Sequence, residues 1–188
     1  MFLSATVFAA SLENVAPSAP AIPPVDFGLG RTATGADIAA WNIDVEPDRR
    51  TLPPGSGTAA QGAKIYASTC ASCHGDQGQG GVAPALVGGA GTLGTAHPVK
   101  TVGSYWPYAT TVFDYIRRAM PFTSPESLSN DEVYALVAYL LSQNGTITGN
   151  AVMNAATLPK VRMANRNGFV WEDPRPDVHT SACMTGCR

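Results

Sequence analysis

The chain lacks the features that direct a protein to nucleic acid or across a membrane. Its 188 residues contain no run of basic side chains, and 12 basic against 14 acidic residues leave a net charge of −2. A protein that binds a phosphate backbone needs a basic patch, so nucleic acid is excluded as a natural partner. An apolar stretch at 1–10 is too short to span a bilayer. It fits a signal-peptide remnant, an anchor or a partner contact, and membrane contact is left open.

Strand patterns and internal repeats are also missing. No segment alternates strongly between apolar and polar residues, whereas helical periodicity predicts helices at 36–41, 59–70, 107–119 and 130–143. Seven of the 15 prolines lie within 11–57 and exclude a long helix or a central strand there. The sequence therefore predicts an all-α domain at 58–148, a Pro-rich N-terminal arm at 1–57 and an irregular C-terminal arm at 149–188.

Cysteine is scarce, but two of the four cysteines lie in the motif Cys70-Ala71-Ser72-Cys73-His74. C-x-x-C-H is the attachment pattern for haem c. Two thiols at this spacing reach the two porphyrin vinyl groups and form thioethers, and His74 then lies under the ring as an axial iron ligand. The motif occurs once, so one covalent haem is predicted. A thioredoxin-like C-x-x-C would follow a strand, and a zinc site with Cys183 and Cys187 would leave His74 unexplained.

A six-coordinate electron-transfer haem needs a second axial ligand, and methionine raises the reduction potential relative to more donating ligands. Met120 is favoured because it follows the helix predicted at 107–119 and precedes Pro121, which restricts it to an extended conformation. The structural alternative is a core methionine. The other candidates are Met163, as runner-up, and then Met153, His97 and His179.

Four further residues are expected around the haem. The Pro84 carbonyl is the candidate acceptor for the other ring nitrogen of His74, because such a bond fixes the tautomer of a ligating histidine. Leu86 is expected to pack on the ring. Tyr105 and Trp106 are candidates to bury the ring and donate to a propionate, with ordinary core packing as the alternative. No residue is assigned a catalytic role.

Together these motifs resemble a class I cytochrome c. The match rests on the Cys70–His74 motif, Pro84-Ala85-Leu86, Met120-Pro121 and the pairs Gly62/Tyr66 and Leu136/Tyr139. In that family the first and last helices cross where a glycine lets an aromatic side chain approach. The resemblance implies a class I cytochrome c core around one covalent haem c, with long irregular N- and C-terminal arms.

The flanking segments look like those of the cytochrome c subunits of sulfane dehydrogenases in the periplasmic Sox sulfur-oxidation system. The similar segments are 27–31, 41–45, 52–57, 102–108 and 158–166. The resemblance implies a periplasmic, non-catalytic subunit that accepts electrons from a molybdenum-cofactor subunit of the sulfite-oxidase type and passes them to a downstream acceptor. One alternative is a diffusible carrier between a quinol-oxidising complex and a terminal oxidase. Another is a haem enzyme or sensor with an open sixth position, against which Met120-Pro121 argues.

Cys183 and Cys187 are predicted to form a disulfide, because haem attachment implies maturation outside the reducing cytosol, where paired cysteines oxidise. The alternative is a pair of free thiols near the end of the chain. Titration of the denatured, unreduced protein with a thiol reagent should detect no free thiol, and two reactive thiols would exclude the bridge. The stabilisation should be modest, because the chain-entropy gain grows with loop length and this loop is short.

Overall fold

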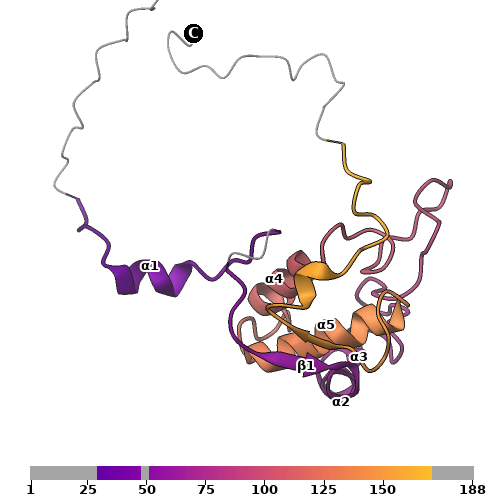
Figure 1. Cartoon of the computed structure of the whole chain (residues 1–188), viewed down its shortest axis with the longest axis horizontal. Coiled ribbons are helices and arrows are strands. Elements are labelled where there is room, and N and C mark those ends of the chain that lie inside the picture. Colours follow the sequence, from indigo (N-terminus) through magenta and orange to yellow (C-terminus); the bar gives the residue numbers. More distant parts are fainter. Residues whose placement is uncertain (1–28, 48–50, 171–188) are drawn as a thin grey trace, which may run out of the picture.

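The computed structural model describes residues 29–47 and 51–170. These residues form helices with very little sheet, which confirms the predicted all-α class (Figure 1). In chain order the elements are α1 (Gly35–Trp41), β1 (Ser56–Thr58), α2 (Ala59–Thr69), α3 (Ala71–His74), α4 (Ala109–Ala119), α5 (Asn130–Gln143), β2 (Val152–Asn154) and the 3-10 helix η1 (Leu158–Lys160). None of the described helices is long and apolar enough to cross a membrane. The segment 1–28 and the Cys183–Cys187 pair lie outside the described residues, so the disulfide stays a prediction.

Three helices begin with a capping box, which explains why they start where they do. In α2 the Thr58 hydroxyl accepts from the Gln61 N–H, and the Gln61 side chain accepts in return from the Thr58 N–H. Ser129 and Glu132 repeat this arrangement at α5. Each box satisfies two backbone N–H groups that the first helical turn leaves without partners. Both of these starts match the prediction from the sequence.

The core is built where α2 crosses α5. Gly62 lies against the Ala135 carbonyl, so closely that a Cβ atom at Gly62 would overlap the carbonyl oxygen. One turn further on, the rings of Tyr66 and Tyr139 lie 5.0 Å apart. The close approach buries most of α5, eight of whose residues are buried. This is the glycine-and-aromatic crossing that the family resemblance implied.

Residues beyond 148, which the sequence assigned to the C-terminal arm, contribute to this core. The strand β2 pairs antiparallel with β1, placing Met153 opposite Gly57. Met153, Leu158 and Met163 are buried with the side chains of α4 and α5. The sequence did not predict these strands, because three residues are too few to show an alternating pattern. Residues 158–163 begin with the helix η1.

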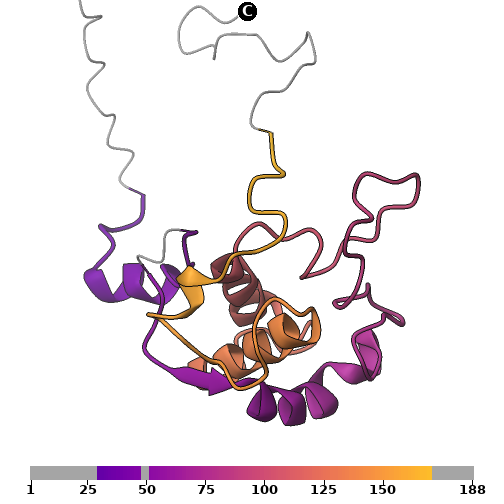
Figure 2. The same cartoon turned by 45° about the vertical axis from the view of Figure 1, so that its right-hand side comes forward.

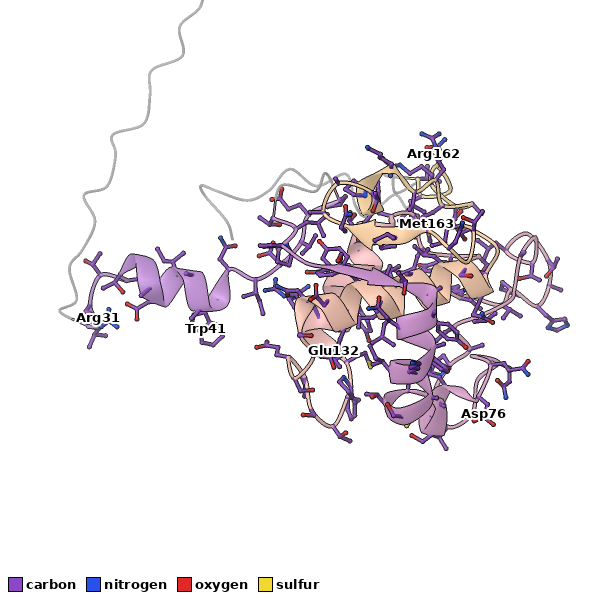
Figure 3. All side chains as sticks on the ribbon, turned by 60° about the horizontal axis from the view of Figure 1, so that its bottom comes forward. Arg31, Trp41, Asp76, Glu132, Arg162 and Met163 are labelled. Carbon is purple, nitrogen blue, oxygen red and sulfur yellow. The ribbon has the colours of Figure 1, made fainter. Side chains whose placement is uncertain are left out.

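Part of the N-terminal arm is tied to α4, and part of it is not. Val45 is buried, and its N–H donates to Asp114 Oδ1 at 2.7 Å. Arg117 Nη1 donates to the Ile43 carbonyl oxygen at 2.6 Å. Beyond these contacts α1 stands away from the other helices, and none of its residues is buried (Figures 1 and 3).

The substitution Gly62→Ala should lower the free energy of unfolding by about 3 kcal/mol, because the new methyl group meets backbone atoms of α5 that cannot move aside. Gly94→Ala is the matched control, since a Cβ atom there meets nothing within 4 Å. Urea unfolding of the haem-loaded proteins measures both. Equal stability of the two variants would show that the helix crossing does not require a glycine.

Candidate haem site

The C-x-x-C-H motif lies at the junction of α2 and α3. Cys70 caps the end of α2 and begins the short turn of α3, where the His74 N–H donates to the Cys70 carbonyl at 3.0 Å. Cys70 is half-buried and Cys73 is exposed, and neither forms a disulfide within the described residues. Burial, with a smaller contribution from Cys73, raises the pKa of the Cys70 thiol to about 11. Both sulfur atoms remain free for thioether bonds.

His74 is oriented by a backbone carbonyl. Its Nδ1 lies 2.7 Å from the Pro84 oxygen, the contact expected from the sequence. A carbonyl oxygen can only accept, so Nδ1 carries a proton, and in the neutral imidazole Nε2 keeps a free lone pair. The backbone reinforces this geometry, because the Ala83 N–H donates to the Cys73 carbonyl at 3.0 Å and the Gly80 N–H to the His74 carbonyl at 2.7 Å.

The loop that carries Pro84 folds back onto the glycine-rich turn after α3. The N–H groups of Leu86 and Val87 both donate to the Gly78 carbonyl, at 2.8 and 2.9 Å. Gly78 has a φ of +74°, a conformation that favours glycine, and a Cβ atom there would meet Val87 Cγ2 at 2.6 Å. Leu86 is partly buried and packs against the core cluster. Its expected contact with the haem stays a prediction.

Met120 caps the end of α4 in an extended conformation, with φ −123° and ψ 146°. Its backbone N–H still donates to the Ile116 carbonyl at 3.1 Å, so the last turn of α4 fixes the position of the Met120 backbone. Met120 is only half-buried. Met153 and Met163, by contrast, are 4% and 3% exposed and belong to the hydrophobic core. Among the described methionines, Met120 is therefore the one that the protein core does not already use.

The remaining candidates for contact with the haem are two aromatic residues and two histidines. The Tyr105 ring packs edge-on against Phe169 at 5.2 Å, and the Trp106 ring against Tyr115 at 5.6 Å. Trp106 also packs against the hydrophobic core, which fits the core-packing alternative, whereas Tyr105 meets the exposed Phe169. A role at the haem stays a prediction for both. His97 lies on the surface in the long connection between α3 and α4, which extends away from the helices (Figure 2). His179 lies outside the described residues.

Two functions of polar side chains were not recognised in the sequence. Arg117 and Arg118 lie in the last turn of α4, where positive charge suits the helix dipole. Arg117 also donates to the Ile43 carbonyl oxygen, and Arg118 also pairs with Asp114 at 2.5 Å. The four-residue spacing of Asp114 and Arg118 could have revealed their pair. Nothing in the sequence pointed to the contacts that Asn144 makes with the loop of Leu86 and Gly88.

The donor set fits a covalently bound haem c. Two free thiols lie three residues apart, and the following histidine presents Nε2 because its other nitrogen is already bonded. A thioether sulfur is available at the end of the helix α4 that follows, on the half-buried Met120. Imidazole and thioether are the axial pair typical of electron-transfer cytochromes. We therefore propose that Cys70, Cys73, His74 and Met120 are the residues that would hold the haem.

Comparisons with known proteins show which proteins the chain resembles. A family model described as "Cytochrome C oxidase, cbb3-type, subunit III" matches residues 57–140. A chain in the crystal structure of the sulfane dehydrogenase SoxCD from Paracoccus pantotrophus is 43% identical, with a TM-score of 0.75 over 87% of this chain and 83% of that chain. A chain of the thiosulfate dehydrogenase TsdBA from Marichromatium purpuratum is 25% identical over 47% of this chain and 20% of that chain, with a TM-score of 0.35. A search of curated protein sequences gave no match.

These findings define the class of protein: the chain belongs to the c-type cytochromes and binds haem c covalently. Within that class it resembles the cytochrome subunit of the Sox sulfane dehydrogenase. Both results confirm the resemblances drawn from the sequence.

Met120→Leu should abolish the weak near-infrared band that a sulfur–iron bond gives to the ferric protein. The substitution removes the thioether and keeps a side chain of similar volume. Met163→Leu is the matched control, because Met163 is buried in the core. Near-infrared absorption of the two ferric variants makes the measurement. A band that persists in Met120→Leu and disappears in Met163→Leu would make Met163 the ligand.

Proposed function

We propose that the chain is the haem c subunit of a periplasmic dehydrogenase that oxidises a reduced sulfur compound, and that a molybdenum-cofactor subunit supplies its electrons. The supporting observation is the extent of the SoxCD match. It includes 87% of this chain, whereas the cytochrome family model is confined to 57–140. The similarity therefore extends into the segments that flank the haem domain, which a shared cofactor alone does not require.

The residues of the site have separate roles in attaching and ligating a redox group. When bound, haem c supplies a one-electron ferric/ferrous couple that can draw single electrons from a two-electron oxidation. Cys70 and Cys73 hold the group to the chain at the end of α2. His74 is kept in one tautomer by Pro84, and Met120 offers a thioether that favours the ferrous state. None of these residues needs to touch the sulfur compound.

The helix α1 supports a lasting contact with a partner subunit. Within α1 Trp41 is 88% exposed and Ile38 is 55% exposed, and Leu29, which precedes the helix, is also 88% exposed. Exposed apolar side chains gathered on one segment mark interaction sites. Figure 3 shows Trp41 on the exposed helix, well away from the core. Exposed aromatic side chains of this kind are frequent anchors in protein–protein contacts. We propose that this face of α1 docks on the molybdenum subunit.

Side-chain hydrogen bonds hold α1 in its helical conformation before any partner binds. Arg31 forms two hydrogen bonds with Asp37, at 2.5 and 2.8 Å, and Thr34 completes a capping box with the same carboxylate. The Arg31 guanidinium first, and Thr34 second, hold the pKa of Asp37 well below its usual range. A lowered pKa means that this support is present above the ordinary carboxyl pKa and is lost as pH falls through the lowered one. A preformed helix loses less conformational entropy on binding.

Isolation of the native protein tests the proposed function. The tagged chain, expressed in cells that oxidise reduced sulfur, should co-purify with a molybdenum-containing subunit at equal stoichiometry. Metal analysis of the purified complex should give molybdenum and iron in a ratio of one to one, because one haem is predicted per chain. An isolated monomer free of molybdenum would instead favour the diffusible carrier.

The double variant Ile38→Ala/Trp41→Ala should weaken binding to the molybdenum subunit by about thirtyfold or more, the loss expected when a central aromatic anchor of about 2 kcal/mol is removed. Val99→Ala is the matched control, since Val99 is 43% exposed on another part of the surface. Affinity is measured with full-length chains, because removal of everything after 148 would also remove the core residues Met153, Leu158 and Met163. Unchanged affinity in the double variant would exclude α1 from the interface.

A further inference from the structure

The side chain of Asn144 joins the end of α5 to the loop that carries Pro84. Its Nδ2 donates to the carbonyl oxygens of Leu86 and Leu140, at 3.1 and 2.8 Å. Its Oδ1 accepts from the Gly88 N–H at 3.1 Å. One amide group therefore binds the loop at two residues and is itself bonded to the last turn of α5.

The position of Asn144 is determined by the way in which α5 ends. Gly145 has a φ of +68°, and its N–H donates to the Ser142 carbonyl at 2.9 Å. The Thr146 N–H donates to the Leu141 carbonyl at 2.9 Å. These two bonds form a Schellman motif, which stops the helix and holds the capping residue in place. The Asn144 side chain thus projects from a rigid helix end.

Two buried hydroxyl groups hold the same loop. Thr101 Oγ1 donates to the Gly88 carbonyl at 2.6 Å. Ser104 Oγ accepts from the Thr101 N–H at 2.9 Å and donates to the Val99 carbonyl at 2.7 Å. Thr101 and Ser104 are 2% and 4% exposed. Buried polar groups are costly to leave unpaired, so this network resists displacement of the loop.

The loop begins at the carbonyl that receives the His74 bond. Pro84 lies two residues before Leu86, whose N–H is bonded to Gly78 and whose carbonyl is bonded to Asn144 and to the Val102 N–H. The pyrrolidine ring fixes the φ of Pro84 itself. As long as Leu86 and Gly88 stay bound, the Pro84 oxygen has little freedom to move away from Nδ1.

We propose that Asn144 is a positioning residue for His74, which tunes the reduction potential by holding the Pro84 carbonyl against Nδ1. A strong bond from Nδ1–H makes Nε2 a more basic ligand, and a more basic ligand favours ferric iron. Release of the loop lengthens that bond, makes the ligand less basic and raises the potential. The inference rests on the proposed function, in which His74 is an axial ligand.

Asn144→Ala and Thr101→Val in the full-length, haem-loaded protein test this role from two sides. Asn144→Ala removes both bonds to the loop, and Thr101→Val removes the bond to the Gly88 carbonyl while keeping the side-chain volume. Both variants should shift the ferric/ferrous equilibrium threefold to tenfold towards ferrous iron, where tenfold corresponds to about 59 mV for one electron. Redox titration measures the shift. Proton NMR of the His74 ring should show faster hydrogen exchange at Nδ1.

Two controls separate positioning from loss of stability. Tyr134→Phe removes a buried hydroxyl that donates to the Pro53 carbonyl at 2.9 Å, so it costs stability without touching the loop. Gln143→Ala changes the exposed neighbour of Asn144. Both should keep the wild-type potential and exchange rate. If the wild type is low-spin but the Asn144→Ala and Thr101→Val variants keep the wild-type potential, the positioning role is wrong and the haem site stands. A wild type without histidine ligation would overturn the haem site, and this inference with it.

Discussion

The close approach of α2 and α5 at Gly62 is the contact on which the rest of the molecule depends. Because no side chain separates Gly62 from Ala135, the two helices approach closely enough for Tyr66 and Tyr139 to pack. The attachment motif starts at the end of α2 and continues through α3, and Asn144 caps the end of α5. One helix crossing therefore positions both the attachment motif and the residue that holds its supporting loop.

Around that crossing, hydrogen bonds hold segments that have no regular secondary structure. The connection between α3 and α4 has no helix or strand of its own, yet backbone bonds to Gly78 and side-chain bonds from Thr101 and Asn144 hold its middle part. The N-terminal segment is held in the same way, by Asp114 and Arg117 on α4. Irregular segments of this kind can present a ligand rigidly because their polar groups are paired rather than exposed to water.

The sequence predicted what depends on local chemistry and missed what depends on distant contacts. Helices with capping boxes at Thr58 and Ser129 were predicted correctly, as was the pairing of His74 with Pro84, because their partners lie within ten residues. The strand pair β1–β2 was missed, since strands of three residues are too short to show an alternating pattern in the sequence. The contacts of Asn144 with the loop were missed, because Gly88 and Leu86 are 56 and 58 residues away along the chain.

We propose that this cytochrome works within a permanent complex with a molybdenum subunit. Rapid mixing of the purified enzyme with its sulfur substrate, with haem reduction followed by absorbance at several protein concentrations, tests it most directly. A fixed complex predicts a reduction rate constant that does not depend on protein concentration, because the electron donor and the haem subunit stay together. A rate constant that rises in proportion to the concentration of either subunit would contradict the claim and would describe a diffusing carrier.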